Sequence, residues 1–213
     1  MKAMSLLESI KHGVRQYMRR VARVLNSATG GKISPNYVTY TGLLAHVPIA
    51  YLIATGQLVV AGILLIFFGL FDTLDGELAR LQKKSSAEGM FIDSATDRMK
   101  EIILYCGIVF YLLESTHTRM AVFILVGALG VSLLTTYLNA WGEVVLAHYN
   151  RSKKHVINQT FRSGLLGFEV RMFLLIIGLL FNQLVVVLSI ILVFGSVTVL
   201  QRFSNIVKTL KNV

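Results

Sequence analysis

The stretch FDTLDGELARLQKKSSAEGMFIDSATDR, residues 71–98, decides the fold. It carries four aspartates, and it lies in a chain of 213 residues of which 54% are hydrophobic and only 15% are charged. A soluble domain of this length rarely has such a composition. The apolar segments on both sides approach the roughly 20 residues that cross a bilayer, so the aspartates have to be explained beside or inside a membrane.

The apolar segments predict an all-α integral membrane protein with six transmembrane helices. The expected spans are residues 36–54, 58–80, 89–113, 120–148, 168–181 (with an upstream extension) and 184–204. Ser34 and Pro35 predict the start of the first span. The segment before it is charged and has no apolar h-region, so we expect no cleavable signal peptide. We divide the chain into residues 1–33 and a transmembrane domain of residues 34–213, and we expect Cys106, inside an apolar span, to be a buried thiol.

The basic residues predict a multi-pass protein of the cytoplasmic membrane, with both termini and the aspartate-bearing loop in the cytoplasm. Only Arg119 falls on the opposite face of the predicted topology. The basic residues on the cytoplasmic face are Lys2, Lys11, Arg15, Arg19, Arg20, Arg23, Lys32, Arg80, Lys83, Lys84, Arg98, Lys100, Arg151, Lys153, Lys154, Arg162, Arg171, Arg202, Lys208 and Lys211. The net charge of +10 is therefore explained by lipid headgroups and phosphorylated substrates, and we expect no nucleic-acid partner.

Residues 1–33 contain a basic amphipathic helix. Apolar residues recur at helical spacing from Leu6 to Leu25, while Arg15, Arg19 and Arg23 follow one another four apart on another side. The pattern is typical of a helix that lies in the membrane interface beside the active site. A helix that only anchors the topology would have the same pattern.

The aspartates occur in two pairs on neighbouring, antiparallel helices. Asp75 and Asp93 lie four or five residues from the ends of the connecting loop, and Asp72 and Asp97 lie eight residues from the same points. The spacing predicts that Asp75 lies at the depth of Asp93 and that Asp72 lies at the depth of Asp97. It also predicts that the aspartates of one helix face those of the other.

Four carboxylates in a partly desolvated place repel one another, so a cation is needed among them. Hard oxygen ligands favour Mg²⁺ or Mn²⁺, with two ions expected, over Zn²⁺. Arg80 and Arg98 are the competing neutralisers, in a purely structural cluster of salt bridges. The small residues Gly76, Ala79 and Gly89 favour a ligand site instead, and carboxylate-held ions next to an arginine suit phosphoryl chemistry.

The spacing resembles the full signature of the CDP-alcohol phosphotransferases, membrane enzymes that transfer a substituted phosphate from a CDP-alcohol to a hydroxyl and release CMP. Its fixed positions are Asp72, Asp75, Gly76, Ala79, Arg80, Gly89, Asp93 and Asp97. Pro35, Asn36 and Thr39 are similar to the family's short motif at the start of the first span.

The resemblance implies a homodimer with a metal pair held by the four aspartates and with Asp97 as general base. It also implies a set of residues that border the cytidine diphosphate. These are Pro35, Asn36, Thr39, Asp75, Gly76, Ala79, Arg80 and Gly89.

The flanks of Asp93 and Asp97 are similar to the branch of the family that makes phosphatidylinositol phosphate. In that branch the fourth span ends in Tyr-x-Arg-Ala-Arg-Ala-Glu, and residues 137–143 read YLNAWGE here, so both arginines are replaced. Asn139 and Glu143 suit hydrogen bonds to hydroxyl groups, which leaves a neutral polyol open as the acceptor. Basic residues that could hold an acceptor phosphate instead are Arg151, Lys153, Lys154, Arg162 and Arg171.

We therefore predict a phosphatidyltransferase that uses CDP-diacylglycerol and a polar, inositol phosphate-like alcohol. A related enzyme with a soluble CDP-alcohol donor and a lipid or polyol acceptor is the alternative within the family. A divalent-cation transporter would spread its acidic residues through the membrane depth, whereas these cluster near one loop. A non-catalytic scaffold with a structural metal is the third alternative.

Overall fold

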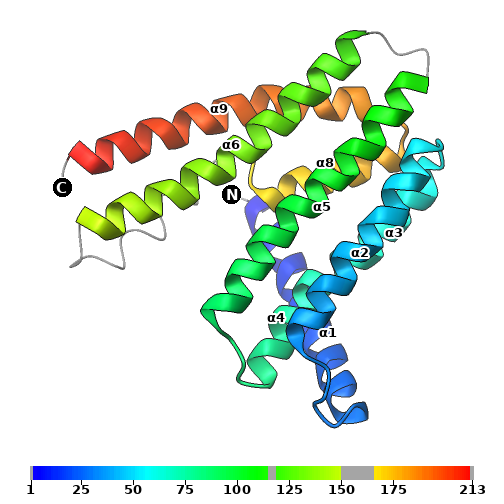
Figure 1. Cartoon of the computed structure of the whole chain (residues 1–213), viewed down its shortest axis with the longest axis vertical. Coiled ribbons are helices and arrows are strands. Elements are labelled where there is room, and N and C mark those ends of the chain that lie inside the picture. The colour runs from blue at the N-terminus through cyan, green and yellow to red at the C-terminus, as the bar shows by residue number, and fades with distance from the viewer. Residues whose placement is uncertain (1, 115–118, 150–165, 212–213) are drawn as a thin grey trace. The chain divides into compact units, whose positions relative to one another are not determined.

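The computed structural model describes residues 2–114, 119–149 and 166–211, and all regular structure in these ranges is helical. The helices are α1 (Lys2–Ala28), α2 (Pro35–Ala54), α3 (Leu58–Gly69), α4 (Phe71–Leu81), α5 (Ala87–Glu114), α6 (Arg119–Tyr149), α8 (Phe168–Leu180) and α9 (Leu184–Lys211), as Figure 1 shows. The all-α prediction is confirmed for these residues.

Four segments are long and apolar enough to cross a membrane, namely Pro35–Ala54, Leu58–Leu81, Arg119–Val145 and Leu184–Lys211. They correspond to the first, second, fourth and sixth expected spans. Helix α5 has 28 residues, but the charged side chains between residues 93 and 101 interrupt its apolar run. Helix α8 has only 13 residues and is preceded by Gly167 in an extended conformation, so the expected extension is absent at residues 166–167, and residues 150–165 lie outside the described residues. Six spans therefore stay a prediction.

The chain divides into two compact units. The first comprises Met1–Thr55 and Ile63–Gly107, and the second comprises Gly56–Gly62 and Ile108–Val213. Helices α3 and α5 contribute residues to both. The four aspartates and the start of α2 belong to the first unit, so this unit contains the family signature.

Helix α1 packs against α4 in the first unit. Met18 and Ala22 of α1 join Leu74 and Leu78 of α4 and Val38 of α2 in one buried apolar cluster. Residues four apart lie on the same face of a helix, which explains why these pairs meet. Residues 2–28 thus form a helix that buries Met18 and Ala22 against α4, while an amphipathic helix at the membrane surface stays a prediction.

Helix α2 begins at Pro35, as predicted. Ser34 precedes it in an extended conformation but makes no capping hydrogen bond through its side chain. The start of the helix therefore depends on the fixed φ of proline, which suits the first helical position.

The second expected span is divided at Leu70. The Leu70 N–H donates to Phe67 O at 3.2 Å, and the Thr73 N–H donates to Leu70 O at 3.2 Å, which is the three-residue spacing of a tight turn. Asp72 therefore lies in the first turn of a separate short helix, α4.

In the second unit, α6 packs along α9, as Figure 1 shows. A Cβ on Gly127 of α6 would lie 2.9 Å from Leu192 Cδ1, and a Cβ on Gly195 of α9 would lie 2.8 Å from Val131 Cγ2. Each helix thus has a glycine where a side chain of the other enters. Such small residues are typical of helix contacts in membranes.

The expectation of a buried Cys106 is wrong, because this thiol is exposed on α5. Apolar composition indicates burial only where the surroundings are water. A helix that crosses a membrane places many apolar side chains toward lipid, so its sequence does not distinguish them from core positions.

We expect Gly107→Ala to destabilise the first unit. A Cβ at Gly107 would lie 2.9 Å from Ala50 Cα on α2, and this backbone cannot move aside as a flexible side chain can. Overpacking of this kind costs about 1–3 kcal/mol, so the melting temperature in detergent should fall by several degrees.

The matched control is Gly130→Ala on α6, where a Cβ would meet no atom within 4 Å. This change should leave the melting temperature unchanged or raise it slightly, because alanine favours helix. Equal melting temperatures for the two variants would contradict the close contact of α2 and α5.

Candidate functional site

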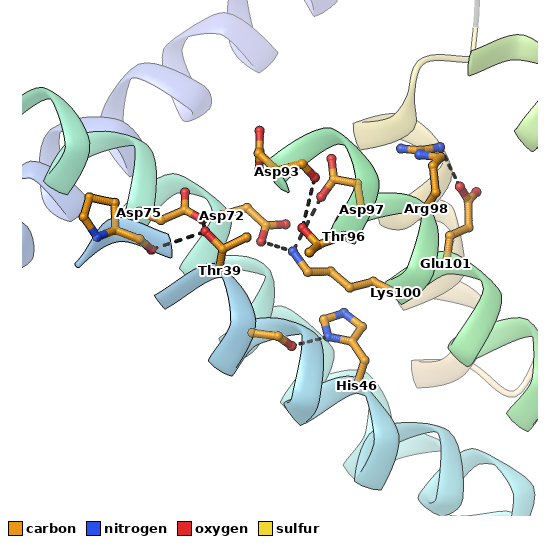
Figure 2. A network of polar contacts seen from close by, with 12 residues as sticks. Thr39, His46, Asp72, Asp75, Asp93, Thr96, Asp97, Arg98, Lys100 and Glu101 are labelled. Atoms are coloured by element: carbon orange, nitrogen blue, oxygen red, sulfur yellow. Dashed lines mark hydrogen bonds and ion pairs between the residues drawn. The ribbon is translucent and has the colours of Figure 1, made fainter. Parts of the chain in front are cut away.

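Three helices of the first unit bring the predicted site residues together (Figure 2). They are the start of α2, the length of α4, and the start of α5. These helices contribute Pro35, Asn36, Thr39, Asp72, Asp75, Gly76, Ala79, Arg80, Gly89, Asp93 and Asp97. All of them lie in the first compact unit.

The short motif at the start of α2 meets the long signature directly. The Thr39 hydroxyl donates to Asp75 Oδ2 at 2.5 Å, and both residues are buried. A Cβ on Gly89 of α5 would lie 3.7 Å from Asn36 Oδ1. Two motifs that are about 40 residues apart in sequence thus form one surface, which sequence spacing alone did not establish.

A lysine lies among the aspartates. The Lys100 ammonium forms an ion pair with Asp72 Oδ1 of α4 and lies 3.5 Å from Asp97 Oδ1. Its side chain is only 1% exposed. Figure 2 shows the carboxylates of Asp72 and Asp97 pointing toward this ammonium from two helices. Lys100 therefore neutralises part of the charge that the four carboxylates bring together.

The stem of Lys100 passes a glycine on α2. A Cβ on Gly42 would lie 4.0 Å from Lys100 Cε and 3.5 Å from Phe71 Cβ. Beside it, His46 Nδ1 bonds to Gly42 O at 2.7 Å, and the imidazole is buried. The lysine thus runs between α2 and α4 to reach the carboxylates.

The two arginines expected to neutralise the aspartates have other acceptors. Arg80 Nη2 donates to Glu77 Oε1 at 2.7 Å, and Arg98 Nη1 donates to Glu101 Oε2 at 2.7 Å. Each arginine thus bonds to a glutamate three residues away on its own helix. The ion pair with Asp72 is formed instead by Lys100, which the sequence analysis assigned only to membrane topology.

A signal for Lys100 was present in the sequence. It follows Asp97 by three residues and Asp93 by seven, which places all three on one helical face. Glu77 was missed for a different reason, because its burial depends on α1 packing against α4.

The residues fit a divalent cation in their donor chemistry. Their donors are carboxylate oxygens, the ligands that Mg²⁺ and Mn²⁺ prefer, and the buried Asp97 Oδ1 accepts no hydrogen bond from the described residues. As they stand, no three His, Cys, Asp or Glu side chains of the described ranges are grouped closely enough to hold an ion. An ion held here would compete with the Lys100 ammonium for Asp72 and Asp97.

The residues predicted to bind the acceptor belong to the second unit or lie outside the described ranges. Asn139 has a buried Oδ1 that accepts no hydrogen bond from the described residues, and Glu143 is half-buried. Arg171 is 2% exposed and donates to Leu166 O at 3.0 Å. Arg151, Lys153, Lys154 and Arg162 lie outside the described residues.

Among the described residues of the second unit, Arg202 is a further buried arginine, which the sequence analysis did not select as a site residue. Arg202 of α9 is 5% exposed, and its Nη1 donates to Thr135 O at 3.0 Å. Buried guanidinium groups in membrane helices are costly and mark candidate functional positions. The sequence offered no signal for it beyond its place at the end of an apolar span.

Known proteins resemble this chain over most of its length. An archaetidylinositol phosphate synthase of Pyrococcus horikoshii is 27% identical over 209 residues, which cover 97% of this chain and 99% of that one. Two other curated relatives match over only about half of their own length.

Solved structures have the same fold. The crystal structure of the Mycobacterium tuberculosis phosphatidylinositol phosphate synthase with CDP-DAG bound has a TM-score of 0.76 at 23% identity, and the match covers 90% of this chain and 94% of that chain. The structure of the same enzyme in complex with manganese and citrate has a TM-score of 0.76 at 24% identity, over 89% of this chain and 88% of that chain. At these identities the likeness shows the fold.

The family itself is shown by a match that includes every position of the signature. Residues 32–201 match the CDP-alcohol phosphatidyltransferase family, and this range contains the motif at the start of α2, all four aspartates and Lys100. The chain therefore belongs to the CDP-alcohol phosphatidyltransferase family.

Proposed function

We propose that this protein transfers a phosphatidyl group from CDP-diacylglycerol to a hydroxyl of an inositol phosphate-like alcohol and releases CMP. The observation that carries the proposal is the convergence of four carboxylates from α4 and α5 beside the start of α2, in a chain of this family. The names of relatives that make inositol phosphate lipids support the choice of acceptor.

Asp97 is the proposed general base. Its Oδ1 is ion-paired with Lys100 but accepts no hydrogen bond from the described residues, so it keeps a lone pair for a hydroxyl proton. The nearby Lys100 ammonium, at 3.5 Å, favours the charged carboxylate that can accept this proton. The deprotonated hydroxyl oxygen then attacks the phosphorus atom of the phosphatidyl group. The bond from this phosphorus to the CMP oxygen breaks, and CMP leaves.

The donor-binding residues are the ones where the two motifs meet. Pro35, Asn36, Thr39, Asp75, Gly76, Ala79, Arg80 and Gly89 are proposed to border the cytidine diphosphate. Arg80 supports this assignment, because its side chain is 53% exposed and a guanidinium suits the geometry of phosphate oxygens. Gly76 and Gly89 let the diphosphate approach the backbone of α4 and α5.

Asp72, Asp75, Asp93 and Asp97 are proposed to hold Mg²⁺ or Mn²⁺, with two ions expected. When bound, such ions neutralise charge on the phosphate and orient the leaving group. The solved structure of a fold neighbour in complex with manganese supports the choice of metal.

An acceptor phosphate requires positive charge, and the two arginines of the family pattern are absent from residues 137–143. We propose Arg171 as one replacement, with Asn139 and Glu143 for hydroxyl groups. Arg151, Lys153, Lys154 and Arg162 are further candidates from the sequence. We also propose a homodimer, because the family resemblance implies one. The basic-residue distribution further supports a place in the cytoplasmic membrane, with both termini and the site facing the cytoplasm.

The reaction is tested by CMP release from the detergent-purified protein with Mn²⁺ and CDP-diacylglycerol. Inositol 1-phosphate, inositol, glycerol 3-phosphate and serine are offered separately. We expect CMP with inositol 1-phosphate alone. No CMP with any acceptor, in protein that still binds Mn²⁺ and CDP, would contradict a lipid donor and favour a soluble CDP-alcohol. Metal flux in proteoliposomes without CMP release would favour transport.

Asp97→Asn should reduce kcat by at least about 100-fold, because the amide cannot accept the proton. CDP binding, measured by calorimetry at saturating Mn²⁺, should change little. The control is Glu114→Gln, an exposed carboxylate at the end of α5, which should keep full activity. Retained turnover in Asp97→Asn would exclude this residue as the base.

Lys100→Met should lower the stability of the metal-free protein but strengthen the binding of Mn²⁺. Without divalent ions the melting temperature should fall, because Asp72 loses its buried cation and such losses cost about 3 kcal/mol. The dissociation constant for Mn²⁺ should fall about tenfold, because the ammonium no longer repels the ion. Lys84→Met, in the exposed loop, should change neither quantity. Weaker Mn²⁺ binding in Lys100→Met would contradict competition.

A further inference from the structure

We propose that Glu77 is a positioning residue for Arg80, and that it makes α1 part of the donor site. The inference rests on the proposed function, in which Arg80 borders the diphosphate of the CDP-lipid. Glu77 occupies a position between the fixed residues of the signature, and its neighbours are three arginines from two helices.

Glu77 is a buried carboxylate whose two oxygens both have partners. Its side chain is 2% exposed. Oε1 accepts from Arg80 Nη2 at 2.7 Å, and Oε2 accepts from Arg19 Nε at 3.0 Å. Arg15 Nε lies 3.8 Å from Oε1. One carboxylate therefore connects the arginine of the signature to two arginines of α1.

The packing of α1 explains why this carboxylate is fixed. Met18 and Ala22 pack on Leu74 and Leu78 of α4. Met18 directly precedes Arg19, and Leu78 directly follows Glu77. The apolar contact and the ion pairs therefore belong to the same helix–helix contact. An exposed pair three residues apart contributes little by itself, but here the glutamate is held from a second helix.

Arg80 is held on the side of α4 that carries the glycine of the signature. A Cβ on Gly76 would lie 3.5 Å from Arg80 Nη2, and Gly76 directly follows Asp75. The guanidinium has five N–H donors, and its hydrogen bond to Glu77 uses the Nη2 group. With more than half of the side chain exposed, the remaining donors can meet a phosphate.

The charges in this cluster suit an anionic ligand. Arg15, Arg19 and Arg80 bring three positive charges to one negative charge on Glu77. The side chains of Arg15 and Arg19 are 63% and 59% exposed, so their outer nitrogens remain accessible. A diphosphate would complete the balance of charge without leaving a buried carboxylate unpaired.

Two opposite effects of Glu77 on the donor can be distinguished. If Glu77 only competed with the diphosphate for Arg80, its removal would tighten donor binding. The burial of Glu77 and its second bond to Arg19 favour positioning instead. In a Glu77→Gln variant an amide N–H₂ would face a guanidinium, and the three arginines would lose their shared negative charge and one of its two acceptor oxygens, so they would repel one another.

The test measures kcat, KM for CDP-diacylglycerol and, by calorimetry, CDP binding in four variants. They are Glu77→Gln, Arg80→Gln, the double variant, and the control Glu114→Gln. We expect Glu77→Gln to raise KM and the CDP dissociation constant about tenfold, the effect of one charge-assisted hydrogen bond, with kcat within about twofold of the parent. The double variant should equal Arg80→Gln within about twofold, because Glu77 acts through Arg80.

An unchanged or lowered KM in Glu77→Gln would overturn the inference, and so would multiplying effects in the double variant. If Glu77→Gln does not fold, Arg19→Gln replaces it, since it keeps the Glu77–Arg80 pair and removes only the bond from α1. Its KM should rise about threefold, and an unchanged KM would exclude a role of α1 in the donor site. Failure of the proposed reaction is recognised separately, because the parent protein would then release no CMP while the calorimetric comparison of CDP binding would still test Glu77.

Discussion

The site depends on one electrostatic constraint, namely that several carboxylates cannot be gathered beside apolar helices without a cation among them. In this protein the cation is the Lys100 ammonium, buried and paired with Asp72. Its stem passes Gly42 on α2, where an added Cβ would lie 4.0 Å from Lys100 Cε, so α2 lies against this pair. The ion pair thus joins α5 to α4 at the aspartates, while Thr39 and the apolar cluster around Val38 join α2 to α4.

The other two acidic side chains of α4, Asp75 and Glu77, also have hydrogen-bond donors as partners. Asp75 accepts a hydrogen bond from Thr39, while Glu77, two residues later and on another face, accepts from Arg19 and Arg80. Each acidic side chain of α4 therefore has a partner from a different helix. This distribution makes α4 the element through which α1, α2 and α5 are held in register around the site.

The sequence predicted the parts of the site that depend on local spacing. The aspartates follow helical periodicity, and the match with Asn36 and Thr39 could be inferred from the family resemblance. Helical spacing places Lys100 on the face of Asp93 and Asp97, but it does not show that Lys100 pairs with Asp72 on the neighbouring helix, because the position near a loop was equally consistent with a role in membrane topology. The burial of Glu77 required knowledge of how α1 packs. The turn at Leu70 was missed because residues 58–81 are continuously compatible with helix, and no proline marks the interruption.

The packing of α1 shows that the packed structure begins before the family match does. The family match begins at residue 32, after α1 has ended at Ala28. Trimming the chain to that homology boundary would uncover Leu74 and Leu78, which are buried by Met18 and Ala22. The newly exposed apolar strip would lie on the helix that carries Asp72 and Asp75, where it would favour aggregation. The smallest stably folded fragment is therefore longer than the segment that the family match covers.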